Sequence, residues 1–194
     1  LRDHGNEAAV GLSEAYAMAV SRRAEPEWAA RADRWAEPIA RLFEAILTHG
    51  VDANGLIVNR ISQKTLEPVN LGACDNWGYL LTGAILFTDA ASRHGKLPAE
   101  RLNKILDRVD KTALVVAKTD GLDWEWGHHD GFADSVESAL YVASRRPTIR
   151  RTLLEWSDDQ IAYLYKFQQP DGIVAGNYLD GNFIRTAMLY AEMR

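Results

Sequence analysis

The sequence predicts an all-α protein made of helical hairpins. Apolar residues recur at helical spacing over most of the chain, and the links between helices alternate between short and long. A loop pattern also occurs three times: a turn containing Asp and Gly, ending at Gly55, Gly121 or Gly172, precedes a helix opened by an Asp. These observations predict one domain of stacked hairpins, with repeat units at about 3–74, 75–129, 130–179 and 180–194 and the long loops at one end.

The first three helices follow from apolar periodicity and from residues that begin or end helices. An Ala-rich helix is predicted at 7–22 and a second helix at 26–48, with Pro26 at its start and Gly50 after its end. Pro38 predicts a kink or a break, because proline lacks the backbone N–H that a helix interior needs. A third helix, at 76–93, is apolar on nearly all sides, which predicts burial, and Gly95 ends it.

Four more helices are predicted at 98–118, 131–144, 149–168 and from 182 onward. The links within pairs are short and carry Pro26, Pro98 and Pro147, so the two helices of each pair are expected to be antiparallel neighbours. Residues 56–58 are candidates for a short strand within a loop, without making a β domain.

Composition excludes several classes of protein. The net charge of −5 and the lack of a basic stripe argue against a nucleic-acid partner, and no apolar run is long enough to span a bilayer. The single Cys74 excludes an intramolecular disulfide and is expected to be a small buried residue. The chain begins with Leu1, which leaves room for a processed segment before it, so the compartment stays open.

Two phrases add a resemblance to a known architecture: residues 75–79 (Asp-Asn-Trp-Gly-Tyr) and residues 168–172 (Gln-Gln-Pro-Asp-Gly). With the hairpin period, they resemble the α/α-toroid proteins, among them the six-hairpin glycosidases and the related polysaccharide lyases. A closed toroid of about twelve helices needs more than 194 residues. The resemblance therefore implies part of a toroid, with further hairpins of a parent chain as partners and a carbohydrate as substrate.

Residues 123–137 hold the densest group of chemically active side chains. On a helix that starts near Asp130, positions 130, 134, 137 and 141 lie within about 60° of one another, so the polar face of this helix is acidic. Glycoside hydrolysis needs two carboxyl groups across a cleft, one protonated and one ionised. The catalytic candidates, with Glu125 and Asp130 as first choices, are Glu125, Asp130, Asp134, His128 and His129. The alternative is that these acidic residues have a structural role, because acids also cap helices and complement the helix dipole.

Aromatic residues near the loops are candidates for stacking on sugar rings. The substrate-binding candidates are Trp77, Trp124, Trp126, Tyr178 and Asp75. The alternative for the aromatic side chains is that they plug the ends of the hairpins, and Asp75 is as well explained as a turn or cap residue. No metal or other cofactor is expected, because His128 and His129 are adjacent and no further ligand spacing accompanies them.

The leading hypothesis is thus a carbohydrate-active domain, most of all a glycoside hydrolase. A polysaccharide lyase would rely on His and Tyr with a cation that neutralises a uronate, and few cations occur in the loops. A scaffold that binds a glycan or a protein without catalysis is a second class. A terpenoid-cyclase-like toroid is weaker, because an Asp-rich diphosphate-binding motif is lacking.

Overall fold

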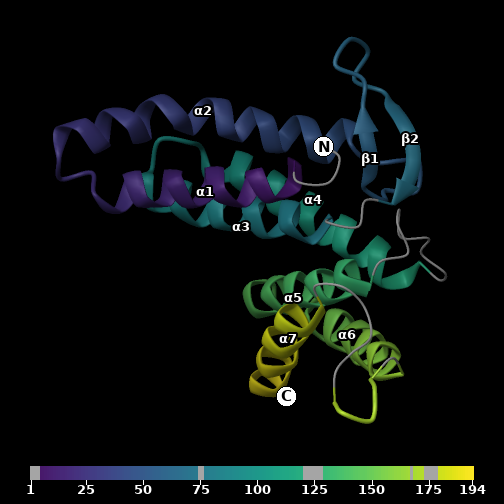
Figure 1. Ribbon diagram of the computed structural model, residues 1–194. Coiled ribbons are helices and arrows are strands. Elements are labelled where there is room, and N and C mark those ends of the chain that lie inside the picture. Colours follow the sequence, from purple (N-terminus) through teal and green to yellow (C-terminus); the bar gives the residue numbers. More distant parts are fainter. Residues whose placement is uncertain (1–4, 74–76, 120–128, 167, 173–178) are drawn as a thin grey trace.

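A computed structural model of the chain describes residues 5–73, 77–119, 129–166, 168–172 and 179–194 (Figure 1). These residues form the helices α1 (Gly5–Ser21), α2 (Pro26–His49), α3 (Trp77–His94), α4 (Ala99–Lys118), α5 (His129–Arg145), α6 (Arg150–Tyr165) and α7 (Leu179–Met193), with the strands β1 (Val58–Ile61) and β2 (Pro68–Ala73). The predicted all-α class is confirmed, and every predicted helix matches an observed one to within a few residues. No helix of the described residues is long and apolar enough to cross a membrane.

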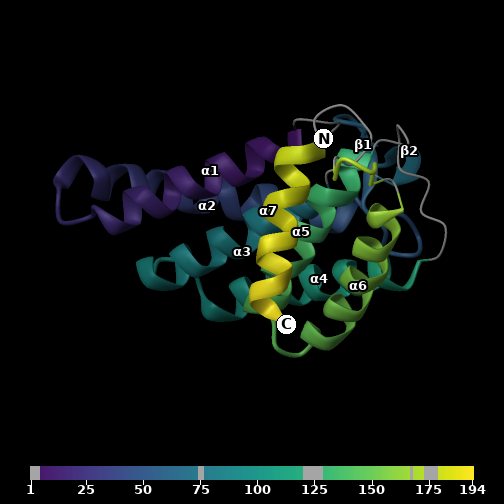
Figure 2. The same cartoon turned by 60° about the horizontal axis from the view of Figure 1, so that its bottom comes forward.

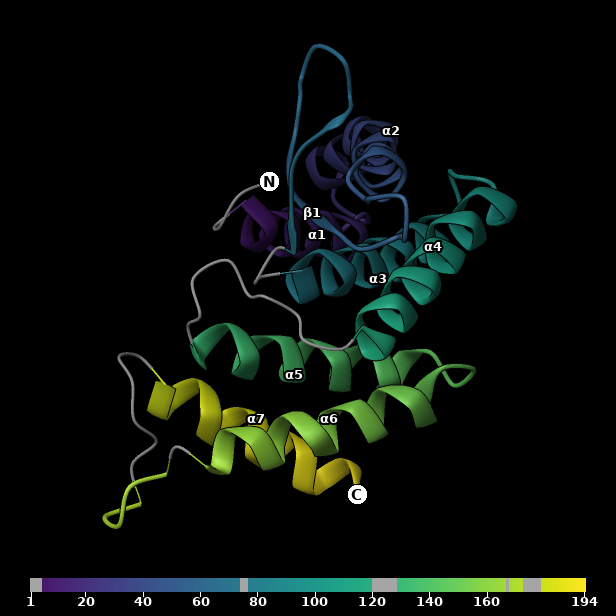
Figure 3. The same cartoon turned by 90° about the vertical axis from the view of Figure 1, so that its right-hand side faces the viewer.

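The helices pack in two rows. α1 packs on α3, α3 on α5 and α5 on α7, so the odd-numbered helices form an inner row, and α2 packs on α4 and α4 on α6 to form an outer row. Figure 3 shows the pairs stacked in order, from α1 and α2 on one side of the molecule to α6 and α7 on the other. A helix of the inner row is covered by its neighbours in both rows, which explains why α3 is buried on most of its surface.

Short links at residues 22–25, 95–98 and 146–149 return the chain within each pair. Figure 2 shows the N-terminus, the β strands and the start of α7 together at one end of the molecule, and the link from α5 to α6 at the opposite end. The starts of the inner-row helices therefore gather where the long connectors attach, as the sequence predicted. We call this the loop end.

The core between α1, α2 and α3 is centred on three aromatic rings. The Phe87 ring lies 5.2 Å from Tyr16 and 5.6 Å from Phe43, measured between ring centroids, and all three side chains are fully buried. At Gly83 the backbone of α3 approaches α1 so closely that a Cβ atom would stand 2.9 Å from the carbonyl oxygen of Ala9. Aromatic packing and this close approach together fix α1 against α3.

A hydrogen-bond chain that leads from the core to the surface lies at the end of α1 and α3 away from the loop end. The hydroxyl of Tyr16 lies 2.9 Å from Nδ1 of His94, and Nε2 of His94 lies 2.9 Å from the Asp33 carboxylate of α2. With Asp33 accepting from Nε2–H, Nδ1 accepts from the tyrosine hydroxyl. Burial, and next the charge of Asp33, raise the pKa of Tyr16 to about 12, so the hydroxyl keeps the proton that it donates.

The ends of the helices follow their sequence signals, with one exception. Gly50 forms the C-cap of α2 and donates its N–H to Ile46, and Gly95, which follows α3, has a φ of 76° that favours glycine. The predicted break at Pro38 is wrong, because α2 runs unbroken through that residue. Proline removes one hydrogen bond, but the buried face of α2 on both sides of it holds the helix together.

The long connector from α2 to α3 contains a β ribbon that the sequence predicted only in part. β1 pairs with β2 antiparallel, joining Val58 to Ala73 and Ile61 to Pro68, with irregular register between. Of the residues expected to be extended at 56–58, Ile57 forms an isolated bridge with Val51 and Val58 begins β1, whereas the rest of β1 and all of β2 were not predicted. The ribbon extends beyond the helices near the end of α2 (Figure 1).

The first Asp- and Gly-containing turn has the structure that its residues predict. The Asp52 carboxylate accepts the backbone N–H groups of Asn54 at 2.8 Å and Leu56 at 2.9 Å, and Gly55 has a φ of 92°. The Asp52 carboxylate accepts hydrogen bonds from two backbone N–H groups that take no part in the β pairing, and Gly55 adopts the left-handed conformation that the turn needs. This aspartate has a structural role.

In the outer row, an ion-pair cluster joins α2 to α4. Arg101 of α4 donates to both carboxylate oxygens of Glu44, at 2.6 and 2.8 Å, and to Glu37 at 2.5 Å. These hydrogen bonds hold the pKa of both glutamate carboxyls below the ordinary value. The cluster ties α2 to α4 in the outer row.

Replacing Arg101 by glutamine is expected to lower the melting temperature by about 2–4 °C at pH 7, since the pairs are partly exposed. Because both pKa values are lower in the folded chain, the stabilisation is complete above the unfolded value of about 4.5 and is lost as the pH falls through the folded values. Thermal unfolding followed by circular dichroism should therefore show that the melting temperatures of wild type and variant converge near pH 3. A difference that stays constant from pH 7 to pH 3 would contradict this origin of the stability.

Candidate functional site

The sequence-predicted site residues divide into three groups. Those that lie outside the described residues are Asp75, Trp124, Glu125, Trp126, His128 and Tyr178. The backbone places His129, Asp130 and Asp134 in the first turns of α5, at the loop end, and their side chains are not described. The side chain of Trp77 is described, at the start of α3.

Trp77 contributes to the core rather than to an exposed surface. Its side chain is 2% exposed, and its ring meets Trp156 of α6 edge-on, with the centroids 5.9 Å apart. A ring enclosed in this way has no free face on which a sugar could stack, so the alternative of an aromatic plug describes Trp77. Trp156 is itself buried and belongs to the same core.

The amphipathic character predicted for α5 is confirmed by the burial of its side chains. The apolar face is fully covered by α3 and α6 and consists of Val136, Ala139, Leu140, Val142 and Ala143. On the polar face, Glu137 and Tyr141 are half-buried. Asp130 and Asp134 precede these two residues on the same face by helical geometry, so a line of polar positions runs from the loop end along the helix.

Two ion pairs fix the polar face of α5 between its neighbours in the inner row. Arg185 of α7 donates from Nε to the Glu137 carboxylate at 2.7 Å, and Arg145 pairs with Asp89 of α3. Glu137 lies closer to the loop end, and its side chain is 28% exposed, so a solute at this face can reach it. The two ion pairs show that this face of α5 lies between α3 and α7.

Tyr141 lies on α5 between these two ion pairs. Its pKa is raised above the ordinary value by burial, with the nearby Asp89 adding to the rise and Arg145 opposing it. The hydroxyl therefore stays protonated at neutral pH. It is suited to donate a proton or a hydrogen bond, and poorly suited to remove a proton.

Buried polar side chains occur near the start of every inner-row helix. They are Asn6 in α1, Thr82 in α3, Ser135 in α5 and Thr186 in α7, each within roughly the first two turns. Asn6, Ser135 and Thr186 are almost fully buried, and Oγ1 of Thr82 and Nε1 of Trp77 have no hydrogen-bond partner among the described residues. Further along the helices, the hydroxyls of Ser13 and Thr88 instead donate hydrogen bonds to backbone carbonyl oxygens of their own helices.

This distribution makes the loop end the polar end of the inner row. Burying a hydroxyl or an indole N–H without a partner is unfavourable, so such groups are rare in a purely structural core. Buried polar groups at the end of a helical domain where its loops attach are common surroundings of a binding site. The sequence did not identify Arg185 and Asp89 as residues of this site. For Arg185, the only signal in the sequence was its position as a basic residue about one turn into a helix opened by Asp180 and Gly181.

Groups of three or more His, Cys, Asp or Glu side chains that could hold a metal ion do not occur among the described residues. Comparisons with protein-family models, with curated proteins and with solved structures find no match to this chain. A function is therefore inferred from the chemistry of the loop end.

Proposed function

We propose that this chain is a carbohydrate-active domain that hydrolyses glycosidic bonds at the loop end of its inner row. The observation that supports the proposal most is the set of buried polar groups near the starts of the four inner-row helices. Two rows of helices, with odd helices packed on odd and even on even, are also the arrangement expected for a segment of an α/α toroid.

In this proposal the carboxyl groups have separate roles. Glu125 and Asp130 are the acid and the base or nucleophile on the two sides of the scissile bond. Asp134 and the Glu137–Arg185 pair continue the polar face along α5 and bind sugar hydroxyls. His128 and His129 assist proton transfer or bind the substrate, and Trp124, Trp126 and Tyr178 provide surfaces on which sugar rings stack.

A polysaccharide lyase is the second candidate, because Arg185 and Arg145 place cations beside Tyr141 on the inner row. A lyase must remove a proton from the carbon next to a uronate carboxyl group, and tyrosine does this only as a phenolate. The raised pKa of Tyr141 disfavours the phenolate. The hydrolase is therefore preferred.

The test is a product screen with the purified protein, together with any parent chain, on neutral and uronic polysaccharides. A hydrolase releases reducing ends without absorbance near 235 nm, whereas a lyase also produces unsaturated ends that absorb there. We expect reducing ends alone, lost in Glu125→Gln at an unchanged melting temperature. Unsaturated ends would replace the hydrolase by the lyase. Binding to a polysaccharide without any product would indicate a non-catalytic scaffold.

A further inference from the structure

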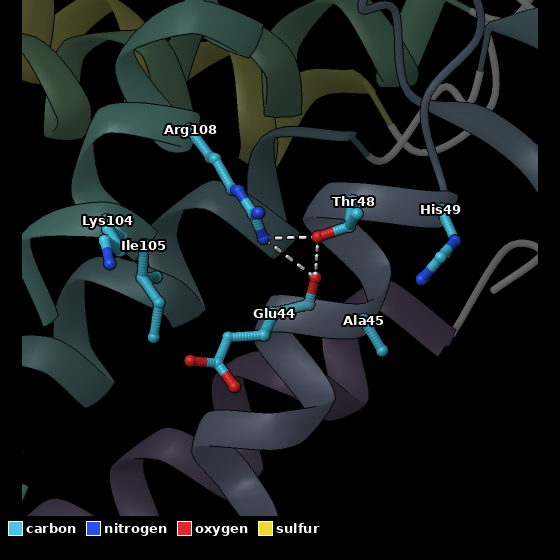
Figure 4. A pocket seen from close by; sticks show the side chains of 7 residues that line it. All are labelled: Glu44, Ala45, Thr48, His49, Lys104, Ile105 and Arg108. Carbon is cyan, nitrogen blue, oxygen red and sulfur yellow. Dashed lines mark hydrogen bonds between the residues drawn. The ribbon is translucent and has the colours of Figure 1, made fainter. Parts of the chain in front are cut away.

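A concave site lies in the outer row, near the C-terminal end of α2. α2 and α4 separate near the end of α2 and leave a cleft of about 290 Å³ between them. Ala45 and Ile105 supply apolar lining, and Thr48, His49, Lys104 and Arg108 supply polar groups. Figure 4 shows these side chains reaching into the region between the two helices, with His49 on one side and Lys104 on the other.

Arg108 is the central polar residue of this cleft, and no carboxylate among the described residues forms a hydrogen bond with it. Its Nη1 donates to the backbone oxygen of Glu44 at 3.2 Å and to the hydroxyl of Thr48, both neutral oxygens. Nε and Nη2 have no hydrogen-bond partner among the described residues. By contrast, the half-buried Arg101 and Arg146 are each held by two oxygens of one carboxylate.

The acidic residue of the cleft does not neutralise Arg108. Both carboxylate oxygens of Glu44 bind Arg101, and Figure 4 shows that the carboxylate points away from the Arg108 guanidinium. Lys104, one turn before Arg108 on the same helix, pairs only with the exposed Glu100. An incoming anion would therefore meet a half-buried guanidinium with free donors, a lysine at the rim and the imidazole of His49.

We propose that this cleft binds a small ligand through an oxyanion group, a phosphate or a carboxylate. The guanidinium of Arg108 offers its free donors side by side, the geometry that binds two oxygens of such a group. The volume suits a ligand of a few heavy atoms beyond the anion, with Ala45 and Ile105 against its apolar part. This proposal does not rest on the proposed hydrolase activity.

The test is a titration of the protein with inorganic phosphate and, separately, with acetate, at constant ionic strength, followed by amide chemical shifts in NMR spectra. We expect saturable shifts at Thr48, His49, Ile105 and Arg108, with an affinity at least about fivefold lower in Arg108→Gln. Stronger binding of phosphate or of acetate identifies which type of oxyanion group the cleft binds. Arg108 also forms hydrogen bonds with α2, so Arg108→Lys serves as a second variant that keeps the charge and is expected to bind with intermediate affinity.

Arg34→Gln is the matched control, because it removes an exposed charge from α2 outside the cleft. It should leave the affinity unchanged. Shifts that do not saturate, or that persist unchanged in a folded Arg108→Gln or Arg108→Lys protein, would overturn the proposal.

Discussion

Replacing Gly83 by alanine is expected to destabilise the folded chain by about 1–2 kcal/mol, although alanine ordinarily favours a helix by about 1 kcal/mol over glycine. The added Cβ would stand 2.9 Å from the carbonyl oxygen of Ala9, 3.0 Å from its carbon and 3.2 Å from the nitrogen of Val10. All three atoms belong to the backbone of α1, which cannot rotate away as a side chain can. α1 and α3 would have to separate, which loosens the packing of Tyr16 on Phe87.

Gly11 provides a control of opposite sign within the same pair of helices. A Cβ at Gly11 meets no atom within 4 Å, and the residue lies in the interior of α1. Gly11→Ala should therefore stabilise the protein by up to about 1 kcal/mol through helix propensity alone. Urea unfolding of the two variants measures both effects. Stabilisation by both substitutions would show that α1 does not approach α3 as closely as described.

The helices were predictable because each is specified by neighbours in the sequence. The apolar stripe of α2, the buried pattern of α3 and the glycines at 50 and 95 are local signals, and the structure follows them. β2 gave no such signal, since it contains Pro68 and Asn70, which are depleted in strands, and its pairing with β1 is irregular. Pro38 shows the opposite case, in which tertiary packing overrides a strong local signal.

The loop end could be located from the sequence, but its contacts could not. Alternating link lengths and repeated turns were enough to predict that the long connectors share one end. The pairing of Glu137 with Arg185 joins residues 48 positions apart, and no periodicity encodes which helix lies beside α5. Likewise, the sequence left open whether Trp77 is accessible or buried, because a tryptophan at a helix start has the same local sequence whether it faces solvent or Trp156.

The proposed catalytic role of Asp130 can be distinguished from the structural role of Asp52, because the same substitution should lower kcat at one site and stability at the other. Asp130→Asn is expected to lower kcat for the released sugar by about 10²–10⁴-fold, the usual loss when a general acid or base is removed. The fold should tolerate it, because Asp130 lies inside the first turn of α5, one residue after the first residue of the helix, and is not its cap. Only a dipole contribution of about 0.3–1 kcal/mol is at risk there.

Asp52→Asn makes the identical chemical change in a turn at the end of α2. There the carboxylate accepts two backbone N–H groups, so the charge-assisted bonds weaken and the melting temperature should fall, with kcat unchanged. Initial rates and thermal unfolding of both variants decide between the two roles of Asp130. If Asp130→Asn lost stability but kept its kcat, the residue would act through the helix dipole, and the acid–base pair would have to be sought among the other carboxylates of residues 123–137.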